Sequence, residues 1–129
     1  MIVLDTHVML WLALEPEKLS AAATEKIGAE SERAISAISA HEIAYLVARE
    51  RVDLYRPVKI WLADVLGAFA MQALPATTAI ALRAGSLDPL DFHGDPVDRL
   101  IYATAVEHDA QLVTADGRLR EADPSRVLW

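Results

Sequence analysis

The strongest constraint on the fold of this chain is a regular alternation between short aliphatic runs and longer helical patterns. Residues 2–4 read Ile-Val-Leu, and the helical pattern of residues 6–14 follows and ends before Pro16. A short aliphatic run of this kind is typical of a buried strand. Strands that are joined through helices pair in parallel and carry helices on both faces. The sequence therefore predicts an α/β fold, a three-layer α/β/α sandwich with a central parallel sheet.

The alternation continues to the end of the chain without an internal repeat or a linker. Further strands are predicted at 34–38, 72–74, 111–113 and 126–128, and further helices at 19–29, 39–51, 58–71, 77–84 and 96–107, with a short one near Arg118. A chain of 129 residues is the usual size for one hydrophobic core. We therefore expect a single domain over residues 1–129.

Composition narrows the classes of function. The chain has no Cys, so disulfides and thiolate metal sites are excluded. No apolar run approaches the roughly 18 residues of a membrane span, and the first residues lack the pattern of an export signal. We expect a soluble, cytoplasmic protein. The net charge of −7 argues against a general nucleic-acid binder, unless cations bound to clustered carboxylates reverse the local sign.

Four acidic residues fall where predicted strands give way to helices. In a parallel sheet these crossings share one edge, so the four side chains should converge there. Four like charges in a small volume repel each other, and a hard divalent cation with oxygen ligands, Mg²⁺ or Mn²⁺, would offset that repulsion. Such a site suits hydrolysis of a phosphodiester. The four acids are Asp5, Glu42, Asp98 and Asp116.

Each of the four acids also has a local structural interpretation. Asp5 is a good N-cap for the helix that follows it, and Ser39 with Glu42 has the spacing of a capping box. Asp98 would be stable in the first turn behind an Asp-Pro helix start, and Asp116 precedes a Gly in a turn. Capping, however, would be served equally well by Ser, Thr or Asn.

Five segments of the chain resemble those of a known family. "IVLDTHVMLWLA", "ISAISAHEIA", "LRAGSL", "DPVDRLIYATA" and "LVTAD" occur in the order found in PIN-domain ribonucleases, in particular the VapC-type toxins of bacterial toxin–antitoxin pairs. The resemblance covers essentially the whole chain. The sequence departs from the commonest pattern at Val97 and His41, which bears on substrate fit more than on chemistry.

The resemblance implies a role for each acid. Asp5, Glu42 and Asp98 match direct ligands of Mg²⁺ or Mn²⁺, and Asp116 matches a ligand that acts partly through water. Thr114 matches a hydroxyl found beside that last acid, although a plain strand threonine is an equal interpretation.

Other residues have two interpretations each. Thr6 either supports the site or caps its helix, and Arg99 contacts a phosphate or carboxylate or is simply solvated. Trp11 is expected in the core or in a subunit interface. The four His residues are not spaced as a metal cluster. A basic stretch is either an RNA-facing surface or a solvated helix end; its members are Arg49, Arg51, Arg56 and Lys59.

The resemblance further implies a metal-dependent endoribonuclease, with an RNA substrate such as tRNA, that is held inactive by a cognate antitoxin protein and forms a homodimer. One alternative is a PIN-fold binding module with little activity, which would be expected to have lost some acids. The other is an aspartate-based phosphotransferase, which usually has a second Asp two positions after the first, where this chain has His7.

Overall fold

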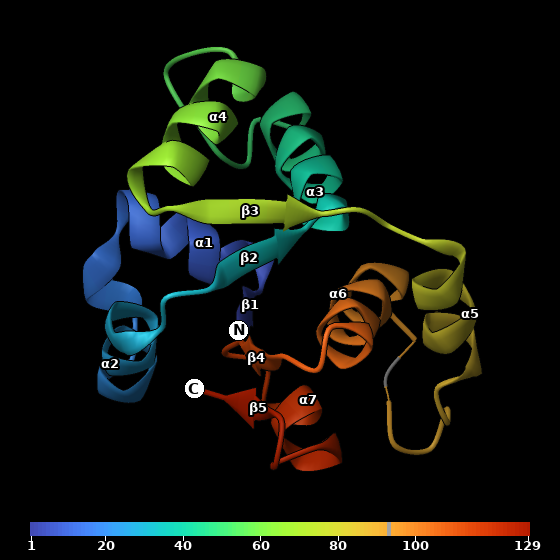
Figure 1. Cartoon of the computed structure of the whole chain (residues 1–129). Coiled ribbons are helices and arrows are strands. Elements are labelled where there is room, and N and C mark those ends of the chain that lie inside the picture. Colours follow the sequence, from blue (N-terminus) through green and yellow to red (C-terminus); the bar gives the residue numbers. More distant parts are fainter. Residues whose placement is uncertain (93) are drawn as a thin grey trace.

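A parallel sheet forms the centre of the molecule in a computed structural model that describes residues 1–92 and 94–129; His93 lies outside the described residues. Within those ranges the strand order is β3-β2-β1-β4-β5, and every neighbouring pair is parallel (Figure 1). The predicted fold class is thus confirmed. The strands are β1 Ile2–Leu4, β2 Arg33–Ser36, β3 Met71–Leu74, β4 Gln111–Val113 and β5 Val127–Leu128.

Helices connect the strands and cover both faces of the sheet. They are α1 Thr6–Leu14, α2 Ala21–Ala29, α3 Ala37–Ala48, α4 Val58–Ala68, α5 Thr78–Ser86, α6 Pro96–Glu107 and α7 Gly117–Ala122, with a 3₁₀ turn at Pro16–Lys18. The predicted bounds are confirmed for α1 and α6. The prediction was wrong at the start of α3, which begins at Ala37 rather than at residue 39. The Ser36 hydroxyl accepts the Ile38 N–H at 3.2 Å and so ends β2 early.

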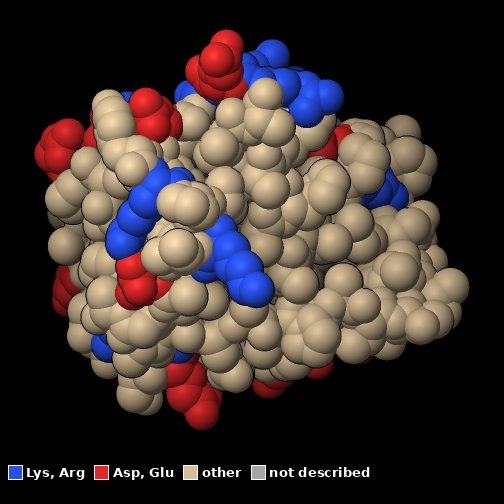
Figure 2. Space-filling model, turned by 90° about the horizontal axis from the view of Figure 1, so that it is seen from above, with Lys and Arg blue, Asp and Glu red and all other residues tan. Residues whose placement is uncertain are grey.

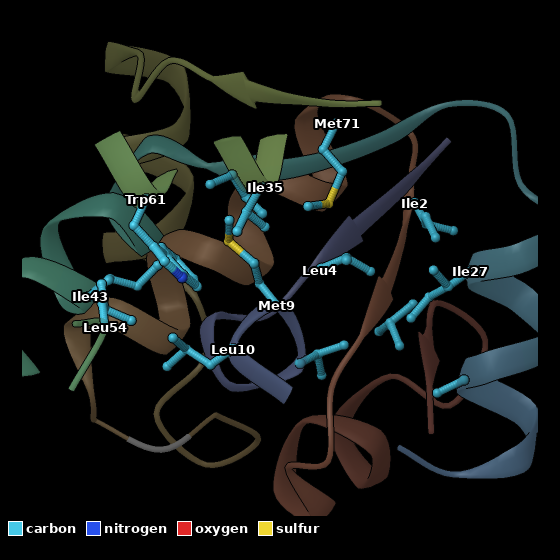
Figure 3. Packing of buried hydrophobic residues seen from close by; sticks show 14 residues of the cluster. Ile2, Leu4, Met9, Leu10, Ile27, Ile35, Ile43, Leu54, Trp61 and Met71 are labelled. Carbon is cyan, nitrogen blue, oxygen red and sulfur yellow. The ribbon is translucent and has the colours of Figure 1, made fainter. Parts of the chain in front are cut away.

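The core is divided by the sheet because successive strand residues point to opposite faces. Ile2 and Leu4 belong to one buried cluster, with Met9, Ile43 and Trp61 (Figure 3). Val3, between them, belongs to a second cluster with residues of α6, α7 and β4. Figure 1 accordingly shows α5 and α6 on the other side of the sheet from α1 and α2.

Two helices start next to each other at the carboxyl edge of the sheet. β1 and β2 are neighbours in register, Leu4 opposite Ile35, and α1 and α3 follow them directly. α6 is fixed to the same edge, because the buried Thr104 hydroxyl bonds to the Ser36 hydroxyl at 3.1 Å. Within the described part of the chain, no helix is long and apolar enough to cross a membrane.

Candidate active site

The four acids line a single pocket of about 370 Å³ at this edge of the sheet. They come from elements far apart in the sequence, and their convergence follows from the parallel topology. The remaining residues that line the pocket are His7, Trp11, Asp95 and Ala115. Of these residues only Asp95 has a signal in the sequence for such a place, as an acid that could assist the metal, although its Asp-Pro helix start accounts for it as well.

Asp5 is the most constrained of the four acids. It follows β1 directly and is the N-cap of α1, where its Oδ1 accepts the Thr6 N–H at 2.7 Å. Its Oδ2 accepts the Thr114 hydroxyl at 2.7 Å. Burial raises the pKa of Asp5, although the hydrogen bonds from Thr114 and Thr6 partly offset the effect. The surroundings of Asp5 therefore stabilise its ionised form poorly.

Thr114 connects two of the acids. Its buried hydroxyl donates to Asp5 and accepts the Asp116 N–H at 3.1 Å. The hydroxyl thus fixes the orientation of one carboxylate and the backbone position of the other. These bonds favour a role in the site over that of a plain strand threonine.

Glu42 lies deeper in its helix than predicted. Because α3 is capped by Ser36, Ser39 and Glu42 both lie inside the helix, and the predicted capping box is wrong. Among the described residues, the buried Glu42 Oε2 makes no hydrogen bond, and neither does the Ser39 hydroxyl. A buried carboxylate oxygen without a partner is costly, so this position favours a further ligand for that oxygen.

Asp98 reaches the pocket by another route than the other acids. α6 follows the α5 helix and a loop, so the prediction of a strand-to-helix crossing was wrong for Asp98. The expected Asp-Pro start is present, since Asp95 Oδ1 accepts the Val97 N–H at 2.9 Å and the Asp98 N–H at 3.4 Å. Asp98 lies in the first turn, where the helix dipole favours its charge.

Asp116 is the N-cap of α7 rather than a simple turn residue. Its Oδ1 accepts the Arg118 N–H at 2.8 Å and the Leu119 N–H at 3.4 Å. Asp5 and Asp116 therefore each use one oxygen to start a helix. Capping and a place in the pocket are combined in the same side chains, so the two interpretations of the sequence do not exclude each other.

The chemistry of the pocket fits a hard divalent cation. The acids supply only oxygen donors, which Mg²⁺ and Mn²⁺ prefer, and Glu42 adds an oxygen that has no hydrogen-bond partner among the described residues. In the described part of the chain no three His, Asp or Glu side chains are already positioned to coordinate an ion. The capping bonds of Asp5 and Asp116 keep their carboxylates at their own helix ends.

Two residues expected to support the site have other surroundings. Thr6 does not cap α1, because Asp5 does; its hydroxyl is buried and, among the described residues, without a hydrogen bond. Arg99 donates from Nε to the Ala84 carbonyl at 2.9 Å and from Nη2 to the Leu87 carbonyl at 2.6 Å. Arg99 therefore holds the end of α5 against α6.

The basic stretch does not form a continuous surface. Arg49 stacks on Tyr45 with its guanidinium carbon 3.5 Å from the ring centre, and Arg56 pairs with Asp64. Figure 2, which views the α4 end of the molecule, shows Lys and Arg in separate groups with acidic residues beside them. Only Arg51 of the four basic residues lines one of the described pockets.

Comparison with known proteins covers nearly the whole chain. Residues 2–124 match the PIN domain family. The chain is 45% identical over 119 residues to Ribonuclease VapC22 of Mycobacterium tuberculosis, which covers 92% of this chain and 89% of that protein.

Solved structures share the fold. VapBC2 from Rickettsia felis, bound to a promoter DNA fragment, has a TM-score of 0.71 at 18% identity and covers 99% of this chain and 98% of that chain. FitAcB from Neisseria gonorrhoeae has a TM-score of 0.69 at 24% identity, with 100% and 97% covered. The family match and the 45% identical relative lead to one conclusion: the chain belongs to the PIN domain family.

Proposed function

We propose that residues 1–129 form a single Mg²⁺- or Mn²⁺-dependent endoribonuclease domain that acts as the toxin of a toxin–antitoxin pair. The observation that carries the proposal is the gathering of the four acids in one pocket. The ribonuclease name of the 45% identical relative supports the RNA substrate.

The acids of the pocket would hold the ion in different ways. Asp5, Glu42 and Asp98 would hold the ion directly, and Asp116 would hold it partly through water. When bound, the ion would lower the pKa of a water and neutralise charge on the phosphate. Thr114 keeps the Asp5 carboxylate oriented before substrate arrives, through the 2.7 Å bond from its hydroxyl.

An antitoxin partner and a homodimer are part of the proposal. A solved structure with the same fold is a toxin–antitoxin complex from Klebsiella pneumoniae. An acidic pocket in a chain with a net charge of −7 would attract a basic side chain. We expect an antitoxin Arg or Lys to reach toward Asp5 or Asp98 and compete with the metal. A cytoplasmic location accords with the absence of Cys.

The test is cleavage of total cellular RNA and of tRNA by the purified chain in Mg²⁺, in Mn²⁺ and in EDTA. Asp5→Asn is the disabled variant, and Asp123→Asn is the matched control because it makes the same chemical change outside the pocket. Cleavage that needs the metal and Asp5 but tolerates the control supports the proposal. Absence of cleavage by the folded chain would refute it in favour of a binding module.

A further inference from the structure

A second cavity of about 450 Å³ adjoins the acid pocket. The side chains of His7 and Trp11 line both cavities, so the two spaces meet at these residues. Leu10 and Leu14 complete this wall, and the four positions have the i, i+3, i+4, i+7 spacing of one helical face. One face of α1 is therefore turned to this cavity, while Val8 and Met9 pack into the core.

The opposite wall comes from the end of α3 and the residues after it. Leu46, Arg51, Val52 and Asp53 supply it. Since α1 and α3 both start at the edge that bears the acids, the space between them leads away from those acids toward the helix ends. We call this cavity the α1–α3 groove. Its base is well packed, because Leu10 belongs to the same buried cluster as Leu54 (Figure 3).

The groove presents one uncommitted positive charge. Arg51 is exposed and makes no ion pair with any described residue, in contrast to Arg56. The two acids in the groove already have partners. Glu15 pairs with Lys18 at 2.8 Å, and Asp53 Oδ1 accepts the Tyr55 N–H at 2.8 Å. The ion pair of Glu15 with Lys18 lowers the repulsion that an anion at Arg51 would meet.

The chemistry along the groove matches a nucleotide. Carboxylates suited to a metal line the acid pocket, an imidazole and an indole line both cavities, and a guanidinium lines the groove. Nucleic-acid bases stack on aromatic rings, and Arg binds phosphate. A protein helix in the groove would pair with Arg51 only if it carried an acidic residue at the matching position. An RNA strand carries a phosphate at every nucleotide.

We propose that the α1–α3 groove binds the nucleotide next to the cleaved phosphate of the RNA substrate, an inference that rests on the proposed ribonuclease function. The base packs on Trp11 beside His7, and the following phosphate binds Arg51. A base in this position is out of its stack, so the groove selects an unpaired stretch of RNA over a duplex. Trp11 is then a substrate-binding residue rather than solely a core or interface residue.

Binding can be measured apart from cleavage. The chain carrying Asp5→Asn, to prevent cutting, is titrated into a fluorescent single-stranded RNA of about 12 nucleotides, and anisotropy gives Kd at several salt concentrations. Arg51→Gln and Trp11→Leu are added separately. Arg120→Gln is the matched control, since Arg120 is exposed, makes the same charge change and lines none of the described pockets. Thermal melting verifies that each variant is folded.

The two variants should weaken binding in different ways. Trp11→Leu should raise Kd about fivefold or more, with no change in salt dependence, because a stacking contact is lost. Arg51→Gln should raise Kd. It should also make the negative slope of log K against log salt less steep by about 0.7, because one phosphate contact is lost. An RNA lacking its bases should bind the original chain and Trp11→Leu equally. General loss of structure would not give this pattern.

The outcomes separate the inference from the function on which it rests. If the unmodified chain cleaves RNA but neither variant changes Kd or the salt slope, the groove inference is overturned and the function stands; the groove is then left to a protein partner. If the unmodified chain fails to cleave, the proposed function fails, even where binding still depends on Arg51 and Trp11. Arg120→Gln weakening binding as much as Arg51→Gln would also overturn the inference.

Discussion

Asp5 and Asp123 are two partly buried carboxylates with opposite electrostatic surroundings. Asp123 accepts the Tyr102 hydroxyl at 2.8 Å and the Ser125 hydroxyl at 2.6 Å, and Arg126 Nε lies 3.7 Å away. Burial alone would raise the pKa of Asp123, but hydrogen bonds from Ser125, Tyr102 and Arg126 outweigh it and lower the pKa. Burial and Asp123 raise the pKa of Tyr102 to about 12, so the phenol stays a donor.

Asp5 has fewer compensating partners. Burial raises its pKa, the Thr114 hydroxyl, the Thr6 N–H and the nearby His7 offset this only in part, and the negative Asp116 adds to the rise. Asp123 therefore stabilises the fold around it, whereas the surroundings of Asp5 disfavour its ionised form. The contrast teaches that acids kept for chemistry can be recognised by surroundings that disfavour their charge, and the buried Glu42 Oε2 atom, which has no hydrogen bond among the described residues, is a second example.

The largest expected effect concerns cleavage. Asp5→Asn should lower kcat for RNA by about 10³-fold, because an ion ligand is worth several kcal/mol in stabilising charge on the phosphate. Asp123→Asn should leave kcat unchanged at a temperature where it is folded. Gel-resolved cleavage rates provide the measurement. Equal activity of the two variants would remove the functional distinction between these carboxylates.

The effect of added metal on stability should also distinguish Asp5 from Asp123. At about 100 times its Kd, Mg²⁺ should stabilise the unmodified chain by about 2.7 kcal/mol, since binding to the folded state shifts unfolding by mass action. Differential scanning fluorimetry would read this as a rise in Tm. The rise should persist in Asp123→Asn and vanish in Asp5→Asn. A similar rise in both would place the ion outside the pocket.

Thr114→Val tests how Asp5 is positioned. The change removes the donor to Asp5 Oδ2 and the acceptor for the Asp116 N–H, with little change in volume. We expect about tenfold more Mg²⁺ to be needed for half-maximal cleavage, as for other partners of metal ligands. A metal titration of the cleavage rate is the measurement. Thr114→Ser should restore the unmodified requirement, and failure to do so would assign the effect to packing.

Local sequence determined much of the fold. The bounds of β1, α1, α6 and β4 follow from aliphatic runs, an Asp cap and an Asp-Pro start, all of which act within a few residues. α3 was predicted two residues late because Ser36 and Ser39 are both good caps. Only tertiary contact, including the hydrogen bond from the Thr104 hydroxyl to the Ser36 hydroxyl, distinguishes them.

The candidate site was predicted in its acids and missed in its surroundings. Asp5 and Asp116 could be predicted because each follows a strand directly. His7 and Trp11 line the pocket because of how α1 is rotated against the sheet. Helical spacing shows that His7 and Trp11 share a face and does not show which face stays open. Arg99 is the reverse case. Its place next to Asp98 in the sequence predicts a role in the site, but its guanidinium donates to carbonyl oxygens at the end of α5.

The smallest effect is on stability, and here the same substitution should act with opposite sign at the two positions. Asp5 has a raised pKa, so its ionised form penalises the fold above that pKa, and the penalty disappears as pH falls below the unfolded value of 3.8. Asp123 has a lowered pKa, so it contributes stability above pH 3.8 that is lost as pH falls through its folded pKa.

At pH 7.5 without metal, Asp5→Asn should raise Tm by about 4 °C and Asp123→Asn should lower it by a similar amount, each about 1 kcal/mol. Both differences should shrink on acidification. A loss of Tm in Asp5→Asn at neutral pH would mean that the hydrogen bonds from Thr114 and Thr6 outweigh burial, and the contrast between the two carboxylates would then fail.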